Sequence, residues 1–499
     1  MKIKFLVISS LSVIFIFSLL AAFTSIPLGI PSEWTWCRVD KLDYFPLFEL
    51  IAIGFFFAVS VFLVYNIDRK PVELSRKLLY ILIIIVFASF YDYYIILSGR
   101  SGISEQIFSV IDPYTSGYLM LAGKINEPCD FFQKYDQFLE KDACSSNHLD
   151  VHPPGNVAFS YLVLESCRNS PLPAWVINQV LPSGVMKDVN YAAQAGVFKD
   201  VSFDEKLNQA AAFIVILFLL MNFISRILLV SALLVFSRGV TRNIGLNTLL
   251  LGFGIPGLIL FLGHYDVMMF FIGASCSLLL ALAVAKEYWK FPIFSMLTGI
   301  MLAIGVIHSL AFAALIFAFI LTIFCCRRQD RKYYKILMLI IGGGIVVAIC
   351  QVFDMNIINM CLLSSRNNSR FFAESGRSYF WLPFNLLDFF IFAGPLLVTL
   401  AFVFLPKLKE YKRFNWPSVQ AVCFAAIFIM LLLLISPFSK GEMGRLMLFF
   451  MPFYALGAGL SLAHLKLNSR NYAMLVCTVG ATGMMTIVLR LFLKLVLVN

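Results

Sequence analysis

Charged residues are scarce in this chain. Asp, Glu, Lys and Arg make up 13% of its 499 residues, whereas hydrophobic residues make up 60%. This composition excludes a set of soluble domains, because many apolar runs reach the roughly 18 to 20 residues that a helix needs to cross a bilayer. Lipid gives the backbone no hydrogen-bond partner, so a spanning chain is helical or a closed barrel, and unbroken apolar runs exclude a barrel. The sequence therefore predicts an all-α, polytopic membrane protein.

Motifs of metal and nucleotide sites are also missing. The sequence has no Cys-x-x-Cys pair, which argues against a dedicated cysteine-rich metal cage, although a divalent cation stays open. The run "IGGGI" at 341–345 lacks the strand and Lys of a phosphate-binding loop, so it indicates helix packing. Cys129 and Cys144 share one polar segment, where an oxidising compartment would allow a disulfide. No cofactor is predicted with certainty.

Basic residues follow every second apolar run, as they do in the cytoplasmic loops of membrane proteins. The net charge of +11 therefore reports topology, and no nucleic-acid partner is expected. The first run has the basic start of a signal peptide, but its length favours an uncleaved anchor. With the N-terminus inside and the C-terminus outside, the pattern predicts thirteen spans near residues 5–28, 47–66, 78–97, 209–236, 243–262, 267–285, 291–307, 309–325, 336–353, 386–405, 417–436, 446–464 and 472–495. The stretch 291–325 makes either two short spans or one re-entrant hairpin.

The largest polar segment, residues 98–207, separates spans 1–3 (residues 1–97) from spans 4–13 (residues 208–499). It contains thirteen of the 28 acidic residues and eight Lys and Arg, so its balance is negative whereas the cytoplasmic loops are positive. The topology places this segment outside, in a periplasm, a lumen or the extracellular space.

Two stretches of this outer segment carry candidate functional residues. "SVIDPYTSGYLMLAG" places Asp112 ahead of Tyr118, and "LDVHPPGNVAF" follows about forty residues later. In the second stretch Pro153 and Pro154 fix their own φ angles and hold the preceding residue extended. The prolines would therefore keep Asp150 and His152 in a fixed relation to the membrane surface.

Two later stretches place polar residues at predicted outer ends of spans. "LILFLGHYDVMMFF" contains His264 and Asp266, which line a pocket or, for Asp266, cap the following helix. "SPFSKGEMGRLMLFFMPF" contains Lys440 and Arg445, which bind a phosphate or extend towards lipid headgroups.

Together these stretches resemble the membrane-integral C-type glycosyltransferases, which include protein mannosyltransferases and aminoarabinose transferases. The resemblance implies a hexosyl- or pentosyltransferase that moves a sugar from a polyprenyl-phosphate donor to an acceptor hydroxyl at the outer membrane face, with inversion. Two departures stand out. The large loop follows the third span instead of the first, and the family's adjacent acidic pair is replaced by Asp112-Pro113. Asp92, in "SFYDYYIIL", is therefore the competing base.

The resemblance also implies roles for the candidate residues. Asp112 would be the catalytic base, and the remaining residues would bind the donor phosphate (Arg445, Lys440, His152, His264 and Asp266) or position the acceptor and the loop (Tyr118, Asp150, Pro153 and Pro154). The implied partners are a polyprenyl-phosphate-linked sugar, membrane lipids and an acceptor that is a lipid, a glycan or a protein.

Two other functions fit the composition. A multi-span transporter or lipid flippase would need polar residues near the bilayer midplane, where Arg226 is the clearest example. An O-antigen-type polymerase would be expected to concentrate arginines in a large later loop, whereas the largest loop here comes early.

Overall fold

The computed structural model describes residues 2–24, 28–30, 34–38, 45–99, 102–112, 117–140, 149, 152–194, 204–237, 242–284, 292–326, 332–374, 381–403, 418–435 and 448–494. Within these ranges the chain is helical, as predicted, apart from turns and three strands of two to five residues. Seven helices are long and apolar enough to cross a membrane, and one bent pair would make an eighth. The protein is thus a multi-pass helical membrane protein.

The elements fall into four groups. The long apolar helices are α1 (Lys2–Phe23), α2 (Leu47–Arg69), α3 (Leu74–Leu97), α11 (Glu205–Ser237), α14 (Asp266–Val284), α17 (Lys332–Val352) and α24 (Ser469–Phe492). The shorter helices of the bundle are α12 (Ile244–Phe253), α13 (Pro256–Leu260), α15 (Ile293–His308), η1 (Leu310–Phe312), α16 (Ala313–Cys325), α19 (Trp381–Ala393), α20 (Pro395–Ala401), α21 (Ser418–Ile435) and α23 (Met451–His464). The more polar helices are α4 (Ser104–Ile111), α5 (Tyr118–Gly123), α6 (Pro128–Gln133), α7 (Tyr135–Glu140), α8 (Gly155–Asn169), α9 (Leu172–Val180), α10 (Val185–Gln194) and α18 (Ile357–Glu374). The strands are β1 (Leu28–Ile30), β2 (Trp34–Arg38) and β3 (Leu493–Lys494).

Each of the thirteen segments expected to span the membrane is helical over most of its described part. Only seven, or eight with the bent pair α19 and α20, meet the length and hydropathy requirement, so thirteen crossings stay a prediction. The shorter helices arise partly from breaks. Proline cannot donate the next backbone hydrogen bond, and α13 and α20 both begin at a proline that follows a glycine within two residues.

The two broken helices meet at their breaks. The helix axis turns by 104° between α19 and α20. Gly394, at this turn, has a φ of 93°, which glycine adopts without strain. A Cβ atom on Gly394 would lie 2.0 Å from the carbonyl oxygen of Gly254, which follows α12. A close contact of two backbones therefore fixes these helices against each other.

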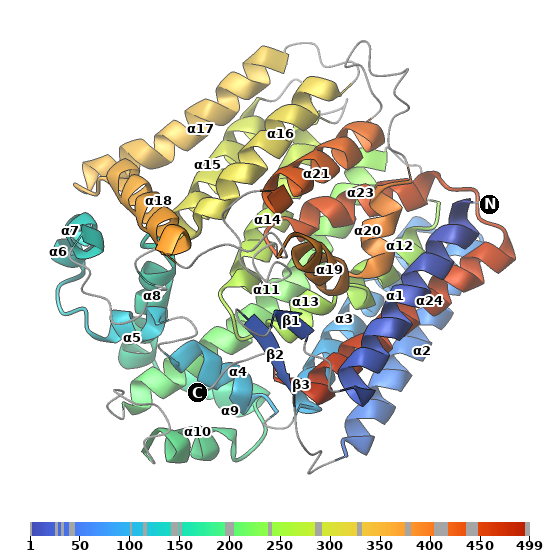
Figure 1. The fold of residues 1–499 in the computed structure, drawn as a ribbon, viewed down its shortest axis with the longest axis horizontal. Helices are drawn as coiled ribbons and strands as arrows, with labels where there is room; N and C mark the ends of the chain where they lie inside the picture. The colour runs from blue at the N-terminus through green and yellow to red at the C-terminus, as the bar shows by residue number, and fades with distance from the viewer. Residues whose placement is uncertain are drawn as a thin grey trace.

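The short helices α4–α10 gather at one edge of the bundle (Figure 1), and α4, α5, α8, α9 and α10 contact α11. Over its 33 residues α11 contains neither glycine nor proline, so nothing in its sequence interrupts the helix. It packs against α4, α8, α9 and α10, and also against α3, α14 and α23. The helix thus links the segment 98–207 to the bundle.

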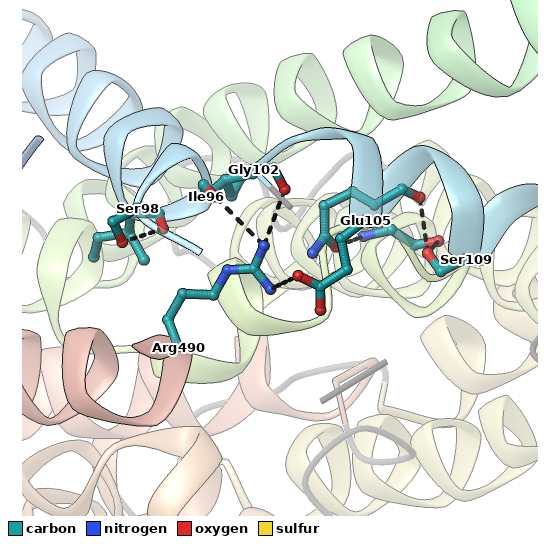
Figure 2. A network of polar contacts seen from close by, with 9 residues as sticks. Ile96, Ser98, Gly102, Glu105, Ser109 and Arg490 are labelled. Carbon is teal, nitrogen blue, oxygen red and sulfur yellow. Dashed lines mark hydrogen bonds and ion pairs between the residues drawn. The ribbon is translucent and has the colours of Figure 1, made fainter. Parts of the chain in front are cut away.

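Arg490, in the last turn of α24, holds the start of this segment in place (Figure 2). Its Nη1 atom lies 2.9 Å from Oε2 of Glu105 in α4. Its Nη2 atom donates hydrogen bonds to the carbonyl oxygens of Gly102, at 3.1 Å, and Ile96, at 3.4 Å. A single guanidinium therefore joins the C-terminal span to the end of α3 and to α4.

The strands that follow α1 and the strand that follows α24 come together beside this contact. The three strands form one antiparallel sheet in the order β1-β2-β3, and Cys37 of β2 pairs with Lys494 of β3. The residues that follow α1 therefore pair with the residues that follow α24. The helix α1 itself also packs against α24.

Gly342, the first glycine of "IGGGI", lies at a close helix crossing, which agrees with the predicted packing role. A Cβ atom on Gly342 of α17 would lie 2.0 Å from the carbonyl oxygen of Met296 in α15. In the same way, a Cβ atom on Gly299 of α15 would lie 1.9 Å from the carbonyl oxygen of Leu339 in α17. Small residues let two helix backbones approach within a membrane.

Candidate functional site

Asp112 ends α4 and is buried. The residue before a proline is driven away from the helical conformation, and Asp112, which precedes Pro113, accordingly has an extended backbone with φ −61° and ψ 122°. Its exposed fraction is 4%, so the carboxyl group does not extend into bulk solvent. The backbone N–H of Gly117 donates to the carbonyl oxygen of Asp112 at 3.4 Å, which places Tyr118 close by at the start of α5.

The helix that carries Asp112 is anchored to the turn that carries His264 and Asp266. The backbone N–H of Gly263 donates to Oε1 of Gln106 at 2.7 Å, and the Ser109 hydroxyl donates to the carbonyl oxygen of Gly263 at 3.0 Å. A Cβ atom on Gly263 would lie 2.1 Å from this hydroxyl, so only glycine fits. This contact joins residues more than 150 positions apart.

Tyr118, His152 and Tyr265 form an aromatic cluster at the same place. The Tyr118 ring meets the Tyr265 ring edge to face with 4.8 Å between centroids, and it meets the His152 ring at 5.9 Å. The Tyr265 hydroxyl lies 2.5 Å from the Ser160 hydroxyl of α8. Burial raises the pKa of Tyr265, so this phenol stays protonated at neutral pH. The cluster therefore combines two candidates from the sequence, Tyr118 and His152, with Tyr265, which the sequence did not single out.

The Pro-Pro corner is buried and stands directly before α8. Pro153 and Pro154 are both buried, and the Tyr135 hydroxyl donates to the carbonyl oxygen of His152 at 3.4 Å. A Cβ atom on Gly155 would lie 2.7 Å from the carbonyl oxygen of Ile307, at the end of α15. The corner is therefore held between the short helix α7 and the tip of the α15–α16 hairpin.

His308 at the tip of that hairpin is a site residue that sequence reasoning missed. Its Nδ1 atom lies 2.9 Å from Oδ1 of Asn156, in the first turn of α8. The sequence contains one hint, because His308 and Ser309 interrupt a long apolar run. The hairpin reaches the segment 98–207 with a polar side chain, next to the corner that holds His152.

The remaining candidates are placed as follows. His264 is buried with an exposed fraction of 4%, and Asp266 is the first residue of α14 and is half-buried. The structure thus brings the segments of Asp112, Tyr118, His152, His264 and Asp266 to one end of the bundle. Arg445, Lys440 and Asp150 lie outside the described residues.

Asp92, the competing base, lies inside the bundle instead. Its Oδ2 atom is 2.5 Å from Nη1 of Arg226, and both side chains are at most 2% exposed. The Asn222 side chain donates to the same oxygen at 3.0 Å, and Arg226 Nε donates to the carbonyl oxygen of Leu251 at 3.4 Å. Asp92 thus neutralises a buried cation, as charged groups within a membrane generally require.

Metal ligands do not cluster in the part of the chain that the structure describes: no group of three or more His, Cys, Asp or Glu side chains there is placed to hold an ion. Cys129 is exposed with a free thiol, and Cys144, its predicted partner, lies outside the described residues.

Comparison with known proteins gives no relative for this chain. No family model, no curated protein and no solved structure matches it. The candidate site therefore rests on its residues and their geometry.

Proposed function

We propose that the protein is a membrane glycosyltransferase that takes its sugar from a polyprenyl-phosphate donor at the extracytoplasmic face. One observation carries the proposal. The segment of Asp112 and Tyr118, the corner of His152 and the turn of His264 and Asp266 lie together at one end of the bundle, although they come from three stretches of sequence. These are three of the four stretches on which the resemblance to C-type glycosyltransferases depends.

The chemistry assigns a role to each kind of side chain. Asp112, as a carboxylate, accepts the proton of the acceptor hydroxyl while that oxygen forms the new glycosidic bond. The bond between the anomeric carbon and the phosphate oxygen breaks, and its electron pair leaves with the polyprenyl phosphate. Attack opposite to the leaving group inverts the anomeric carbon.

The departing phosphate needs cations and hydrogen-bond donors. Arg445 provides a planar guanidinium fork that matches phosphate oxygens, and Lys440 adds a second positive charge. His152 and His264 add ring N–H groups, and Asp266 orients the sugar through its hydroxyls. Tyr118 and Asp150 contact the acceptor, whereas Pro153 and Pro154 fix the loop.

The test is Asp112→Asn, which keeps the shape of the side chain and removes the base. We expect sugar transfer to fall by about 10²–10⁴-fold, the usual contribution of a general base. The assay follows release of polyprenyl phosphate from a panel of polyprenyl-phosphate sugars, in native membranes that supply the acceptor. Asp188→Asn is the matched control, because Asp188 is an exposed carboxylate on α10. Equal turnover by the two variants would remove Asp112 from this role.

A transporter or lipid flippase is the second candidate, and the two broken helices favour it. Discontinuous helices that meet within a bundle often line the substrate sites of secondary transporters. Here Gly254 and Gly394 are in contact at the two breaks, and Leu251, one turn before Gly254, accepts a hydrogen bond from the buried Arg226. Protein-dependent flipping of an intact polyprenyl-phosphate sugar in liposomes, without release of polyprenyl phosphate, would favour this candidate.

A further inference from the structure

The helix α18 stands at the end of a membrane span. It begins five residues after α17 ends, and the chain reverses sharply between them at Asp354, which has a φ of 57°. Figure 1 shows α18 lying across the end of α17, beside α6 and α7. Because α17 is one of the seven helices long and apolar enough to cross a membrane, we expect α18 to lie at the surface of that membrane.

One face of α18 packs against the rest of the protein. Met360 and Ser364, one turn apart, are fully buried. The Asn359 side chain donates to Oδ2 of Asp136 in α7 at 3.1 Å, and the Asn367 side chain donates to the carbonyl oxygen of Leu139 at 3.1 Å. This face therefore attaches α18 to the segment 98–207.

The opposite face is exposed, and it is apolar in its first half and basic in its second half. Four side chains spaced four residues apart form one ridge: Ile358, Leu362, Arg366 and Arg370. The two apolar members are 57% and 64% exposed, and Val352 and Phe353, at the end of α17, are exposed as well. Both arginines are exposed, and neither guanidinium has an ion pair or hydrogen bond to a described residue.

We infer that α18 is an interfacial helix whose exposed ridge binds anionic phospholipids, with Ile358 and Leu362 in the acyl region and Arg366 and Arg370 on headgroup phosphates. Two features support this occupant. The apolar half of the ridge begins only a few residues after the exposed apolar end of a candidate membrane span, where lipid would surround the chain. The basic half complements phosphate, and a guanidinium that extends to the interface is stable there.

This inference is independent of the proposed reaction, but it concerns the same part of the molecule. Through Asn359 and Asn367, α18 holds α7, and Tyr135 of α7 donates a hydrogen bond to the carbonyl oxygen of His152. Lipid bound to the ridge would therefore fix the height of the candidate site above the bilayer.

Lipid retention measured by native mass spectrometry tests the basic half of the ridge. The full chain is reconstituted in nanodiscs of phosphatidylcholine mixed with phosphatidylglycerol and is then released. We expect the double variant Arg366→Gln/Arg370→Gln to bind phosphatidylglycerol about 30-fold more weakly, since each cation near an anionic surface contributes about fivefold. The matched control is Lys124→Gln/Lys187→Gln, which removes two exposed charges from α10 and the end of α5 without touching the ridge.

Photo-crosslinking tests the apolar half. We expect p-benzoylphenylalanine placed at position 362 to crosslink to phospholipid acyl chains, and the same residue at exposed position 191 on α10 to do so far less. Retention of phosphatidylglycerol unchanged by the arginine variants, or crosslinks from position 362 to protein alone, would overturn the inference. Displacement of phosphatidylglycerol by polyprenyl phosphate at equal concentration would overturn it too, because the ridge would then select the donor lipid.

Discussion

Removing the Arg490 side chain should release the start of the segment 98–207 from the bundle. The Arg490 guanidinium is 1% exposed and its partner Glu105 is 15% exposed, so Arg490→Ala leaves a nearly buried carboxylate without its cation. Breaking such a pair costs about 3–5 kcal/mol, and the residual solvent contact of Glu105 favours the lower end. The carbonyl groups of Gly102 and Ile96 also lose a charged donor. We expect a loss of about 3 kcal/mol in local stability.

Hydrogen exchange measured by mass spectrometry localises the effect. Peptides that cover the end of α3 and α4 should exchange about 100-fold faster in Arg490→Ala, because local opening becomes easier by the same free energy. Peptides from the membrane-spanning α2 should not change. Gly99→Ala should reproduce part of the effect, since a Cβ atom there would lie 2.4 Å from Arg490 Nε and would displace the guanidinium. Figure 2 shows the contacts that both changes disturb.

The matched control is Arg76→Ala. Arg76 and Glu73 form an ion pair at 3.9 Å in which both side chains are at least 70% exposed, and such pairs contribute about 1 kcal/mol or less. Adding Glu105→Gln to Arg490→Ala should restore part of the lost stability, because the uncompensated charge is gone. If Arg490→Ala opens α4 no more than Arg76→Ala does, the ion pair does not hold this segment.

Two further changes test the bundle itself. Arg226→Gln should lower the free energy of unfolding by about 3–5 kcal/mol, and adding Asp92→Asn should recover part of this loss. Thermal unfolding in detergent measures both effects. A double variant less stable than Arg226→Gln alone would contradict a buried ion pair. Gly342→Ala should destabilise the crossing of α15 and α17 by about 1–3 kcal/mol. Gly344→Ala should be tolerated in the same assay, because nothing lies within 4 Å of its added methyl group, and equal losses would place the crossing elsewhere.

The helices were predictable because each depends on local sequence. Uninterrupted apolar runs gave α2, α3, α11 and α24 close to their observed bounds. The 104° bend at Gly394 was less readable, since the apolar run continues across Gly394-Pro395 and conceals the break. The number of crossings stays a prediction for the same reason, because hydropathy does not separate a short span from a broken one.

The candidate site was only partly predictable, because its contacts are long-range. Local patterns singled out Asp112, Tyr118 and the corner at His152, and the structure brings their segments together. Nothing in the sequence joined Ser109 to Gly263, or His308 to Asn156, since 154 and 152 residues separate the partners. Arg490 was simply the end of a predicted span. Its partner, Glu105, is one of thirteen acidic residues in an outer segment that gave no means to choose among them.

Two ion pairs contribute to the placement of Asp112. In lipid the hydrophobic effect does not drive helices together, so polar contacts and close packing decide their register. Asp92 ties α3 to α11 through Arg226, and Glu105 ties α4 to α24 through Arg490. The chain from Asp92 to Glu105 is thereby fixed at both ends, against two different helices. Asp112 follows seven residues after Glu105, at the end of the same short helix, so these cations help to set its position together with the contacts that Gln106 and Ser109 make to Gly263.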